Sequence, residues 1–445
     1  MKKFLKFCLM SIIIVTLAFI TYKVSDKYNL DILKDDIDCT IITKGVENSR
    51  AIALDENGIM YIAFDDSIKQ IDNDGKEKLI YKDKNLKIED LAYKDGALYF
   101  ISDSRLNKFL LSNNTVQVLI DNIPLGGNGI DRKLLITDKE AYITIGSVTN
   151  SGISEGADFD RTPIDLTLNG INIDGTGAFK GKGIKSEQGE GIKSSPIGNG
   201  TVYKLALESG SLELYACGIR GISGIDINSE NNIMAIFSGM KDEGIRPVKR
   251  DKDYIYELKK NEWYGFPDFS GGDNISSPRF KGDEIIKPLL KTYPKKSPLG
   301  PIYQHTSVDA LKELGIDKNG LVLGKDTMVF WDKSENVIGA LDKNNVYKKI
   351  LKVSNESLVE DIIFNGNEFL ILDSGIGCVY NIKAKEGILG FTLPVVVWVF
   401  VFLLAFTILM IVVYKMSKKR NKVISKGTWL LLWFLYLLVR KKESP

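Results

Sequence analysis

Histidine is nearly absent from this chain of 445 residues, which contains only one, His305. Histidine is the side chain best suited to acid–base work near neutral pH and is a frequent metal ligand. With a single histidine and no Cys-x-x-Cys spacing, the sequence gives no indication of a zinc site. His305 remains a candidate general base, and the alternative is a structural histidine whose ring is satisfied by hydrogen bonds.

Cysteine is also scarce, with four in the chain. Cys8 lies inside the first hydrophobic segment, which leaves Cys39, Cys217 and Cys378 for the folded part. An odd number cannot all pair, so the sequence predicts buried free thiols. A bridge between Cys39 and Cys378, near the two ends of the folded part, is the alternative.

Charge of neither sign is in excess. Lys and Arg total 59 against 57 for Asp and Glu, a formal net charge of +2. A nucleic-acid-binding domain would be expected to carry a clustered basic surface, so this balance argues against a nucleic-acid partner. Glycine is abundant at 40 residues and aromatic residues make up 10%, a composition that suits many short strands and turns.

Long uncharged segments occur near both ends. Residues 1–23 begin with lysines and continue as an apolar run, which predicts a signal anchor or a signal peptide. The anchor is favoured because no small-x-small cleavage pattern follows. Residues 391–414 carry no charge and are long enough to form a transmembrane helix. Residues 415–445 are rich in lysine and include a short apolar segment, 429–439, that predicts an interfacial helix; a plain stop-transfer flank is the alternative.

The basic flanks set the expected orientation. Lysines precede the first segment and follow the second, so both flanks are expected in the cytoplasm. Residues 24–386 are then an extracytoplasmic domain of a protein in the cell membrane.

A structural repeat runs through this domain. An alternating apolar segment, a turn with Gly, Asp or Asn, and a second segment rich in Tyr, Phe and Ile recur, and the nearest copies are about 40 residues apart, as in propeller blades. Larger gaps indicate insertions at about 151–200 and 266–311. We predict an all-β, six-bladed β-propeller, with a multidomain β-sandwich as the alternative. The copies begin at Ala51, Asp90, Lys133, Gly221 and Glu360, and a weaker one surrounds the segment LVLGKDTMVFWD from Leu321.

Candidate binding residues concentrate between Ala216 and Asp273. Arg220 ends a strand-like run beside a glycine turn, where an arginine can contact a ligand or pair with a carboxylate. Asp242, Glu243 and Arg246 share a charged loop that could bind a polyol or a cation, or could simply be solvated.

An aromatic corner follows this loop. Tyr264, between Trp263 and Phe266, could stack on a sugar or quinone ring, or could pack in the core. Asp268 could accept hydrogen bonds from hydroxyl groups or cap a turn.

These motifs together resemble those of the soluble sugar dehydrogenases that depend on pyrroloquinoline quinone, the glucose/sorbosone dehydrogenase family. The resemblance covers roughly residues 90–385. It implies a six-bladed propeller with a quinone cofactor, activated by a calcium ion that is held largely by backbone carbonyls. The matching segments are Ile143–Gly152, Asp165–Phe179, Gly218–Asp226, Glu262–Phe280 and QHTSVDAL around His305.

The resemblance also shows what this chain lacks. The family carries its proton-accepting histidine on a loop that corresponds to Leu125–Asp131, where no histidine occurs. Gly221 stands where the family has an Asn-Pro turn beside the arginine, and Cys378 stands where it commonly has an arginine. Without the histidine, Asp131 or His305 would have to act as the base.

By this resemblance the candidates divide into three sets, and the residues of a metal site stay unknown. Asp131 and His305 are candidate catalytic residues. Arg220, Asp242, Glu243 and Arg246 are candidate cofactor-binding residues. Asn128, Tyr264 and Asp268 are candidate substrate-binding residues.

Two functions remain open at this level. The first is a propeller with reduced or lost catalysis that binds a carbohydrate, an envelope polymer or a protein partner at the cell surface. The second is an active quinone-dependent oxidoreductase, with pyrroloquinoline quinone and calcium as cofactors, that oxidises a sugar, polyol or aldehyde. A histidine at 125–131 in close relatives would favour the second.

Overall fold

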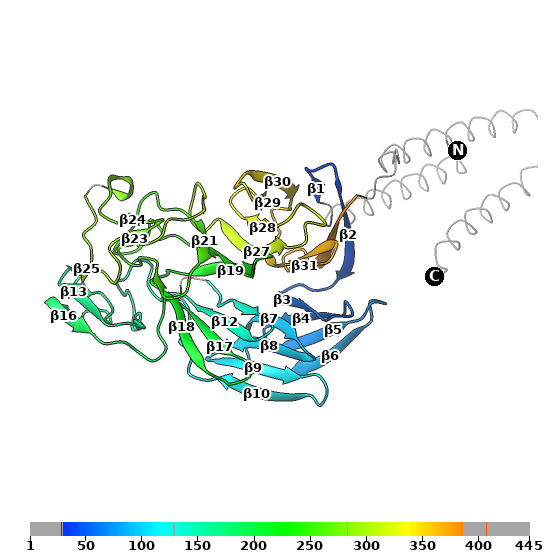
Figure 1. Cartoon of the computed structure of the whole chain (residues 1–445), viewed down its shortest axis with the longest axis horizontal. Helices are drawn as coiled ribbons and strands as arrows, with labels where there is room; N and C mark the ends of the chain where they lie inside the picture. Colours follow the sequence, from blue (N-terminus) through cyan, green and yellow to red (C-terminus); the bar gives the residue numbers. More distant parts are fainter. Residues whose placement is uncertain (1–27, 29, 128–129, 283, 386–405, 407–445) are drawn as a thin grey trace, which may run out of the picture. The chain divides into compact units, whose positions relative to one another are not determined.

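A computed structural model of the protein describes residues 28, 30–127, 130–282, 284–385 and Phe406 (Figure 1). The chain divides into two compact units, 1–385 and 386–445, and of the second only Phe406 is described. The predictions for residues 1–23, 391–414, 415–445 and Asn128 therefore lie outside the described residues. No helix in the described part of the chain is long and apolar enough to cross a membrane.

The first unit is all-β apart from one 3-10 helix, η1 (Pro278–Phe280), among the residues described. Most of its strands form six sheets of four or five strands, which are antiparallel apart from one added strand and are numbered here 1 to 6. Sheet 1 holds β3 (Ser49–Leu54), β4 (Met60–Phe64), β5 (Ser67–Ile71) and β6 (Glu77–Lys82). Sheet 2 holds β7 (Ile88–Lys94), β8 (Ala97–Ser102), β9 (Arg105–Leu110) and β10 (Thr115–Ile120). Sheet 3 holds β11 (Leu134–Ile136), β12 (Glu140–Ile145), β17 (Thr201–Ala206) and β18 (Leu212–Cys217), with β22 (Glu262–Trp263) added in parallel.

The other three sheets continue along the chain. Sheet 4 holds β19 (Ile222–Ile227), β20 (Ile233–Phe237), β21 (Tyr254–Leu258) and β26 (Tyr303–Gln304). Sheet 5 holds β27 (Leu311–Asp317), β28 (Thr327–Asp332), β29 (Val337–Leu341) and β30 (Tyr347–Lys352), with β1 (Asp31–Ile32) at its edge. Sheet 6 holds β31 (Val359–Asn365), β32 (Glu368–Asp373), β33 (Cys378–Ala384) and β2 (Ile37–Lys44).

The sequence repeat corresponds to the first two strands of each sheet. The copies from Ala51, Asp90, Lys133, Gly221 and Glu360 fall on the first hairpins of sheets 1, 2, 3, 4 and 6. The weaker copy around the segment from Leu321 corresponds to sheet 5, whose first strand β27 begins at Leu311 and whose second strand β28 lies within that segment.

The first strands of consecutive sheets contact one another. The order of contact is β3, β7, β11, β19, β27 and β31, and β31 again contacts β3. A separate hydrophobic cluster fills each of the six gaps between consecutive sheets, including the gap between sheets 6 and 1, where Leu370 and Leu372 pack with Ile52 and Ile62. The N-terminal strand β2 completes the sheet built from the end of the domain. The fold is therefore all-β and propeller-like.

Five of these six first strands carry a β-bulge. The register of the ladder skips one residue in β3, β7, β19, β27 and β31. A bulge leaves its extra residue unpaired and re-aims the side chain. The residues skipped are Arg50, Glu89, Ser223, Glu313 and Glu360.

In every second sheet, an aspartate side chain on the first strand accepts a backbone hydrogen bond from the first strand of the next sheet. The Asp226 side chain on β19 accepts a hydrogen bond from the backbone N–H of Ile316 on β27 at 2.9 Å. Asp90 does the same for Leu134 at 2.7 Å, and Asp361 for Ile52 at 3.1 Å. The last of these bonds joins sheet 6 to sheet 1. A buried N–H without an acceptor is costly, so these carboxylates stabilise the contacts between sheets.

We expect Asp226→Ala to lower the free energy of unfolding by about 1–3 kcal/mol, because the Ile316 N–H loses its acceptor. Asp226→Asn keeps one acceptor oxygen and should lose less. Chemical denaturation followed by circular dichroism measures both. Equal stability of the alanine variant and the wild type would show that this link between sheets contributes nothing.

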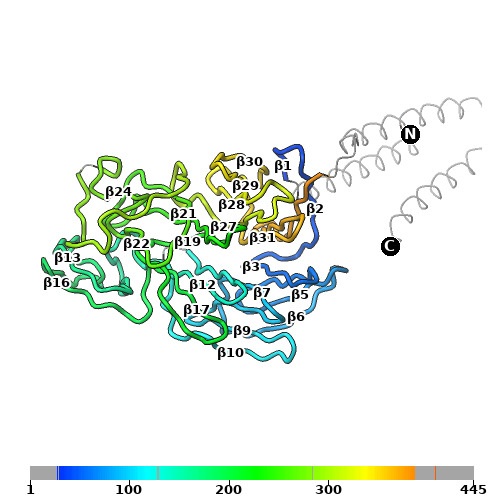
Figure 2. Tube along the Cα trace, viewed as in Figure 1, coloured from blue at the N-terminus to red at the C-terminus, as the bar shows by residue number. Residues whose placement is uncertain are grey.

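The two predicted insertions are confirmed, and they pack together. The first contains β13 (Leu166–Asn169), β14 (Asn172–Ile173), β15 (Thr176–Gly177) and β16 (Gln188–Ile192), and the second contains β23 (Phe269–Ser270), β24 (Asp273–Asn274), η1 and β25 (Leu290–Thr292). Strands β16, β13 and β25 form one sheet, so the insertions share a hydrogen-bonded ladder. Figure 2 shows this layer at the end of the unit opposite β5 and β6.

No disulfide joins Cys39, Cys217 or Cys378 in the described part of the chain. The Cys39–Cys378 bridge is therefore wrong. Cys217 and Cys378 are buried, as predicted, and Cys39 is half-buried. On the paired strands β2 and β33, Cys39 lies opposite Ile382 and Cys378 lies opposite Lys44, so the two side chains are offset along the ladder.

Candidate functional site

Two cavities lie between the first strands of the sheets. Cavity A, of about 320 Å³, is lined on one side by Arg50, Asp131 and Glu360 and on the other by Lys241, Asp309, Lys312 and Lys333. Cavity B, of about 400 Å³, is lined by Asp55, Asp90, Asp226, Asp317, Lys318 and Asp361 among others. Lys133 and Glu313 line both. The bulges explain the polar character of cavity A, because Arg50, Ser223, Glu313 and Glu360 are all bulge residues that line it.

The Lys133–Glu313 ion pair separates the two cavities. The Lys133 Nζ lies 2.6 Å from Glu313 Oε2, and each residue is only 8% exposed. Burial would lower the pKa of Lys133, but Glu313, Asp90 and Asp361 raise it above its usual value. Burial raises the pKa of Glu313 well above its usual value, although Lys133 opposes this.

Three lysines of cavity A share one carboxylate. The Nζ atoms of Lys312 and Lys333 each lie 3.5 Å from an oxygen of Asp309, and that of Lys241 lies 3.7 Å away. Burial alone would raise the pKa of Asp309, but the three lysines hold it below its usual value. Lys241 also lies 3.8 Å from Glu243. We call Lys241, Lys312, Lys333 and Asp309 the lysine cluster; its charge is positive by two units when all four are ionised.

Asp131 is the predicted catalytic residue that lines cavity A. It follows the loop that contains Asn128, and its carboxylate lies 3.7 Å from the guanidinium of Arg50. The loop is held close to its neighbours: a Cβ at Gly127 would come within 2.5 Å of the Val148 Cα, and one at Gly221 within 2.6 Å of the Ile130 side chain. Gly221, which departs from the family pattern, thus makes room for the loop that lacks the histidine.

His305, the other candidate base, does not line either cavity. It is 6% exposed, and its Nε2 lies 3.1 Å from Asp332 Oδ2 while its Nδ1 lies 3.2 Å from the backbone nitrogen of Ser307. Burial lowers the pKa of His305, but the hydrogen bond to Asp332 outweighs it and the pKa is raised. This placement gives His305 a structural partner rather than access to a substrate in cavity A.

Arg220 is buried and does not line cavity A. Its Nε donates to the carbonyl of Asn150 at 3.1 Å, and its own carbonyl accepts the N–H of Ser147 at 2.7 Å. Its Nη2 has no hydrogen-bond partner among the described residues. Burial lowers the pKa of Arg220 from its usual value, while Asp253 and Asp251 oppose the shift.

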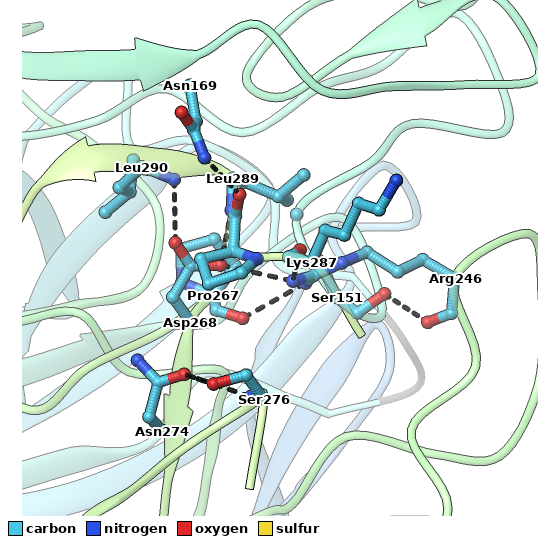
Figure 3. A network of polar contacts seen from close by, with 12 residues as sticks. Ser151, Asn169, Arg246, Pro267, Asp268, Asn274, Ser276, Lys287, Leu289 and Leu290 are labelled. Atoms are coloured by element: carbon cyan, nitrogen blue, oxygen red, sulfur yellow. Dashed lines mark hydrogen bonds and ion pairs between the residues drawn. The ribbon is translucent and has the colours of Figure 1, made fainter. Parts of the chain in front are cut away.

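The remaining candidate cofactor-binding residues, Asp242, Glu243 and Arg246, share one loop but differ in exposure. Asp242 and Glu243 are exposed, and the Asn150 side chain donates to the carbonyls of Lys241 and Glu243 at 2.8 and 3.1 Å. Arg246 is buried and bonded to Asp268 at 3.1 Å (Figure 3). These three do not line cavity A, but Lys241, just before Asp242, does.

The substrate candidates Tyr264 and Asp268 both lie in packed regions. The Tyr264 hydroxyl accepts the N–H of Lys259 at 2.8 Å and donates to the Glu257 carbonyl at 3.2 Å, and its ring packs on Phe237 and Tyr256. Asp268 is fully buried and accepts the backbone N–H groups of Leu289 and Leu290 at 2.8 and 2.7 Å. Both side chains therefore stabilise the insertion layer and its junction with sheet 4.

Several residues of cavity A were missed by the sequence analysis. Arg50 and Glu360 occupy bulges, which break the alternation of a strand and leave no simple sequence pattern. A usable signal was the Glu-Asp pair that precedes an apolar run twice, at Glu89–Asp90 and at Glu360–Asp361. Lys241 and Lys333 lie in loops of different sheets, and only the fold brings them to Asp309.

Metal binding by side chains has no support within the residues described. No group of three or more His, Cys, Asp or Glu side chains there is placed to hold a metal ion.

A scan against protein-family models finds no match, and neither does a search of curated proteins. Solved structures do match. The soluble aldose sugar dehydrogenase of Escherichia coli, in its apo form, is 12% identical with a TM-score of 0.51, over 78% of this chain and 100% of that one.

Two other structures give the same result. The calcium structure of the Trichoderma reesei carbohydrate-active enzyme of family AA12 is 12% identical, with a TM-score of 0.54 over 80% of this chain and 98% of that one. The holo form of the pyranose dehydrogenase PQQ domain from Coprinopsis cinerea is 11% identical, with a TM-score of 0.52 over 80% and 97%. The chain has the fold of the quinone-dependent sugar dehydrogenases. The resemblance given by the motifs is thus confirmed, as a resemblance of fold.

Proposed function

We propose that this protein is a membrane-anchored, extracytoplasmic six-bladed β-propeller that binds carbohydrate in cavity A without oxidising it. Residues 1–23 and 391–414 are its proposed membrane segments. The observation that carries the proposal is the position of its single histidine: His305 is buried against Asp332 and lines neither cavity.

The proposed six-bladed ring rests on the contacts between sheets. Six sheets, six clusters between them, and first strands that contact in a cycle are what closure of a propeller requires. Strand β2, from the start of the domain, completes the sheet that contains its end, which supports closure of the ring by both ends of the domain.

Cavity A suits a polyhydroxylated ligand. It is lined mainly by charged side chains, and the indole Nε1 of Trp331, which also lines it, has no hydrogen-bond partner among the described residues. Hydroxyl groups can both donate to carboxylates and accept from ammonium and indole N–H groups. A sugar can therefore form hydrogen bonds with both the carboxylates and the ammonium groups of cavity A.

The charges of cavity A also fit part of the quinone. Pyrroloquinoline quinone is a carboxylate-bearing ring, and Lys241, Lys312 and Lys333 would hold its carboxylates. When bound, such a quinone supplies a hydride acceptor. One observation favours this second candidate function: Glu360 lines cavity A, and burial raises its pKa, as is common for a general base. Asp131 is the other carboxylate placed to hold a proton there.

We expect the full-length protein in detergent micelles to bind at least one of cellotriose, galactotriose and trigalacturonate, measured by calorimetry. Asp131→Trp places a large ring in cavity A and should abolish binding. The substitution breaks only the partly exposed Arg50 pair, which is worth about 1 kcal/mol or less. Asp138→Trp, at a side chain that is 92% exposed, is the control. Binding that survives Asp131→Trp would remove cavity A as the binding site.

A further inference from the structure

We infer that the ligand of cavity A is an acidic glycan, bound through its carboxylate or phosphate groups by Lys241, Lys312 and Lys333. This inference rests on the proposed carbohydrate binding and adds the chemical class of the ligand. It starts from the imbalance of the lysine cluster, in which three ammonium groups surround one carboxylate at 3.5 to 3.7 Å.

The other charges nearby do not remove this imbalance. Lys133 is paired with Glu313 at 2.6 Å, and Arg50 lies 2.8 Å from Asp65 and 3.7 Å from Asp131. Glu243 approaches Lys241 no closer than 3.8 Å. Arg50 is outnumbered on its side of cavity A by Asp65, Asp131 and Glu360, so this part of the cavity is negative, whereas the part that holds the lysine cluster is positive.

The three lysines are partly exposed, and their ion pairs with Asp309 are long. Their side chains are 25%, 18% and 47% exposed for Lys241, Lys312 and Lys333. Distances of 3.5 Å and more to Asp309 are longer than the roughly 2.7–2.9 Å of a charge-assisted hydrogen bond. Each ammonium group can therefore form shorter bonds to an incoming anion than it forms within the protein.

A second observation points to a ligand at the same place. Trp331, at the end of β28 and two residues before Lys333, is 3% exposed, lines cavity A, and has an indole N–H without a partner among the described residues. A sugar hydroxyl or an acid oxygen can accept that hydrogen bond. A neutral sugar would use this donor but would leave the excess charge of the lysine cluster uncompensated.

Two sources can supply the anion, so the test uses both. Trigalacturonate carries carboxylates, and a short glycerol phosphate oligomer carries phosphates; galactotriose is the neutral match. We expect at least one acidic probe to bind the full-length protein in detergent about tenfold or more tightly than galactotriose, since ion-assisted hydrogen bonds are the strong class. Preference for one of the two acidic probes identifies the source of the anion. Binding should weaken as salt is raised, because the cavity is open to solvent.

Substitutions of the lysines and of the aspartate in the lysine cluster should change the affinity for the acidic probe in opposite directions. Lys312→Gln and Lys333→Gln should each weaken the acidic probe about tenfold, with little change for galactotriose. Asp309→Asn should tighten the acidic probe several-fold, because it removes the internal competitor while an asparagine tolerates the positive φ of 52° at this position. Lys94→Gln and Asp138→Asn, an exposed pair at 2.8 Å, are the matched controls.

Equal affinity for galactotriose and the acidic probes, unaffected by the lysine substitutions, would overturn the inference and leave carbohydrate binding intact. Weaker binding by Asp309→Asn would also overturn it, since the aspartate would then be a ligand contact. Absence of binding by every oligosaccharide would overturn the proposed function itself.

Discussion

Replacing Lys133 with methionine is expected to lower the free energy of unfolding by about 3–5 kcal/mol, because it leaves a buried carboxylate without its partner. Glu313 is 8% exposed and its nearest cation is Lys133 at 2.6 Å. Asp90 and Asp361 add negative charge to the same region, and both raise the pKa of Glu313. Chemical denaturation of the full-length protein, followed by circular dichroism, measures the loss.

The pH dependence of this variant has a definite sign. The folded-state pKa of Glu313 is raised above its usual value of 4.5, and loss of Lys133 removes the largest influence that lowers it. A glutamate with a raised folded pKa favours folding below its unfolded pKa, and this contribution disappears as pH rises through the folded pKa. The deficit of Lys133→Met should therefore be smallest near and below pH 4.5 and should grow as pH rises.

The double variant Lys133→Met/Glu313→Gln is the control. It removes both charges, so it should recover a large part of the lost stability. Stability of Lys133→Met equal to the wild type at neutral pH would contradict the burial of this pair. Failure of the double variant to recover any stability would assign the loss to packing rather than to charge.

Replacing Arg246 with methionine is the second change with a large expected effect, again about 3–5 kcal/mol. Its guanidinium bonds to Asp268 at 3.1 Å, to the carbonyl of Ser151 at 2.6 Å, and to those of Pro267 and Lys287, both at 3.1 Å (Figure 3). One side chain thereby connects both insertions. Its loss leaves Asp268 buried and unpaired.

The geometry of this site distinguishes arginine from lysine. Arg246→Lys keeps the charge but cannot donate to four acceptors at once, so it should recover less than half of the loss. In limited proteolysis of Arg246→Met, the insertions should be cleaved earlier in time than sheets 1 and 2. Arg105→Lys, in an exposed pair with Asp121 at 3.2 Å, is the control and should change stability by less than about 1 kcal/mol. Unchanged protease resistance in Arg246→Met would contradict the role of this network.

Much of the fold could be predicted because its signal is local. A hairpin such as Asp90–Asp103 shows period-two alternation and a turn within one short segment, and the copies repeat it. The pairing of β13 with β25 could not be predicted, since it joins segments more than a hundred residues apart and depends on the tertiary fold.

The site was harder to predict because its residues are distant in sequence. Lys241 and Lys333 meet at Asp309 only when loops of sheets 4 and 5 are adjacent. The motif-rich stretch drew attention to Arg246, Tyr264 and Asp268, whose side chains are buried and bonded within the protein. Asp131 lines cavity A, and the glycines of its loop are visible in the sequence; the close approach to Val148 requires one at Gly127.

Carbohydrate binding without oxidation is tested most directly by a dye-linked turnover assay of the full-length protein, loaded with pyrroloquinoline quinone and calcium, on sugars, polyols and aldehydes. We expect no turnover above that of the same mixture without protein. The variant Asn128→His, which places a histidine in the loop where the family has one, should be measured in the same assay. Turnover by the wild type that is lost in Asp131→Ala or Glu360→Gln would contradict the proposal and establish an active oxidoreductase.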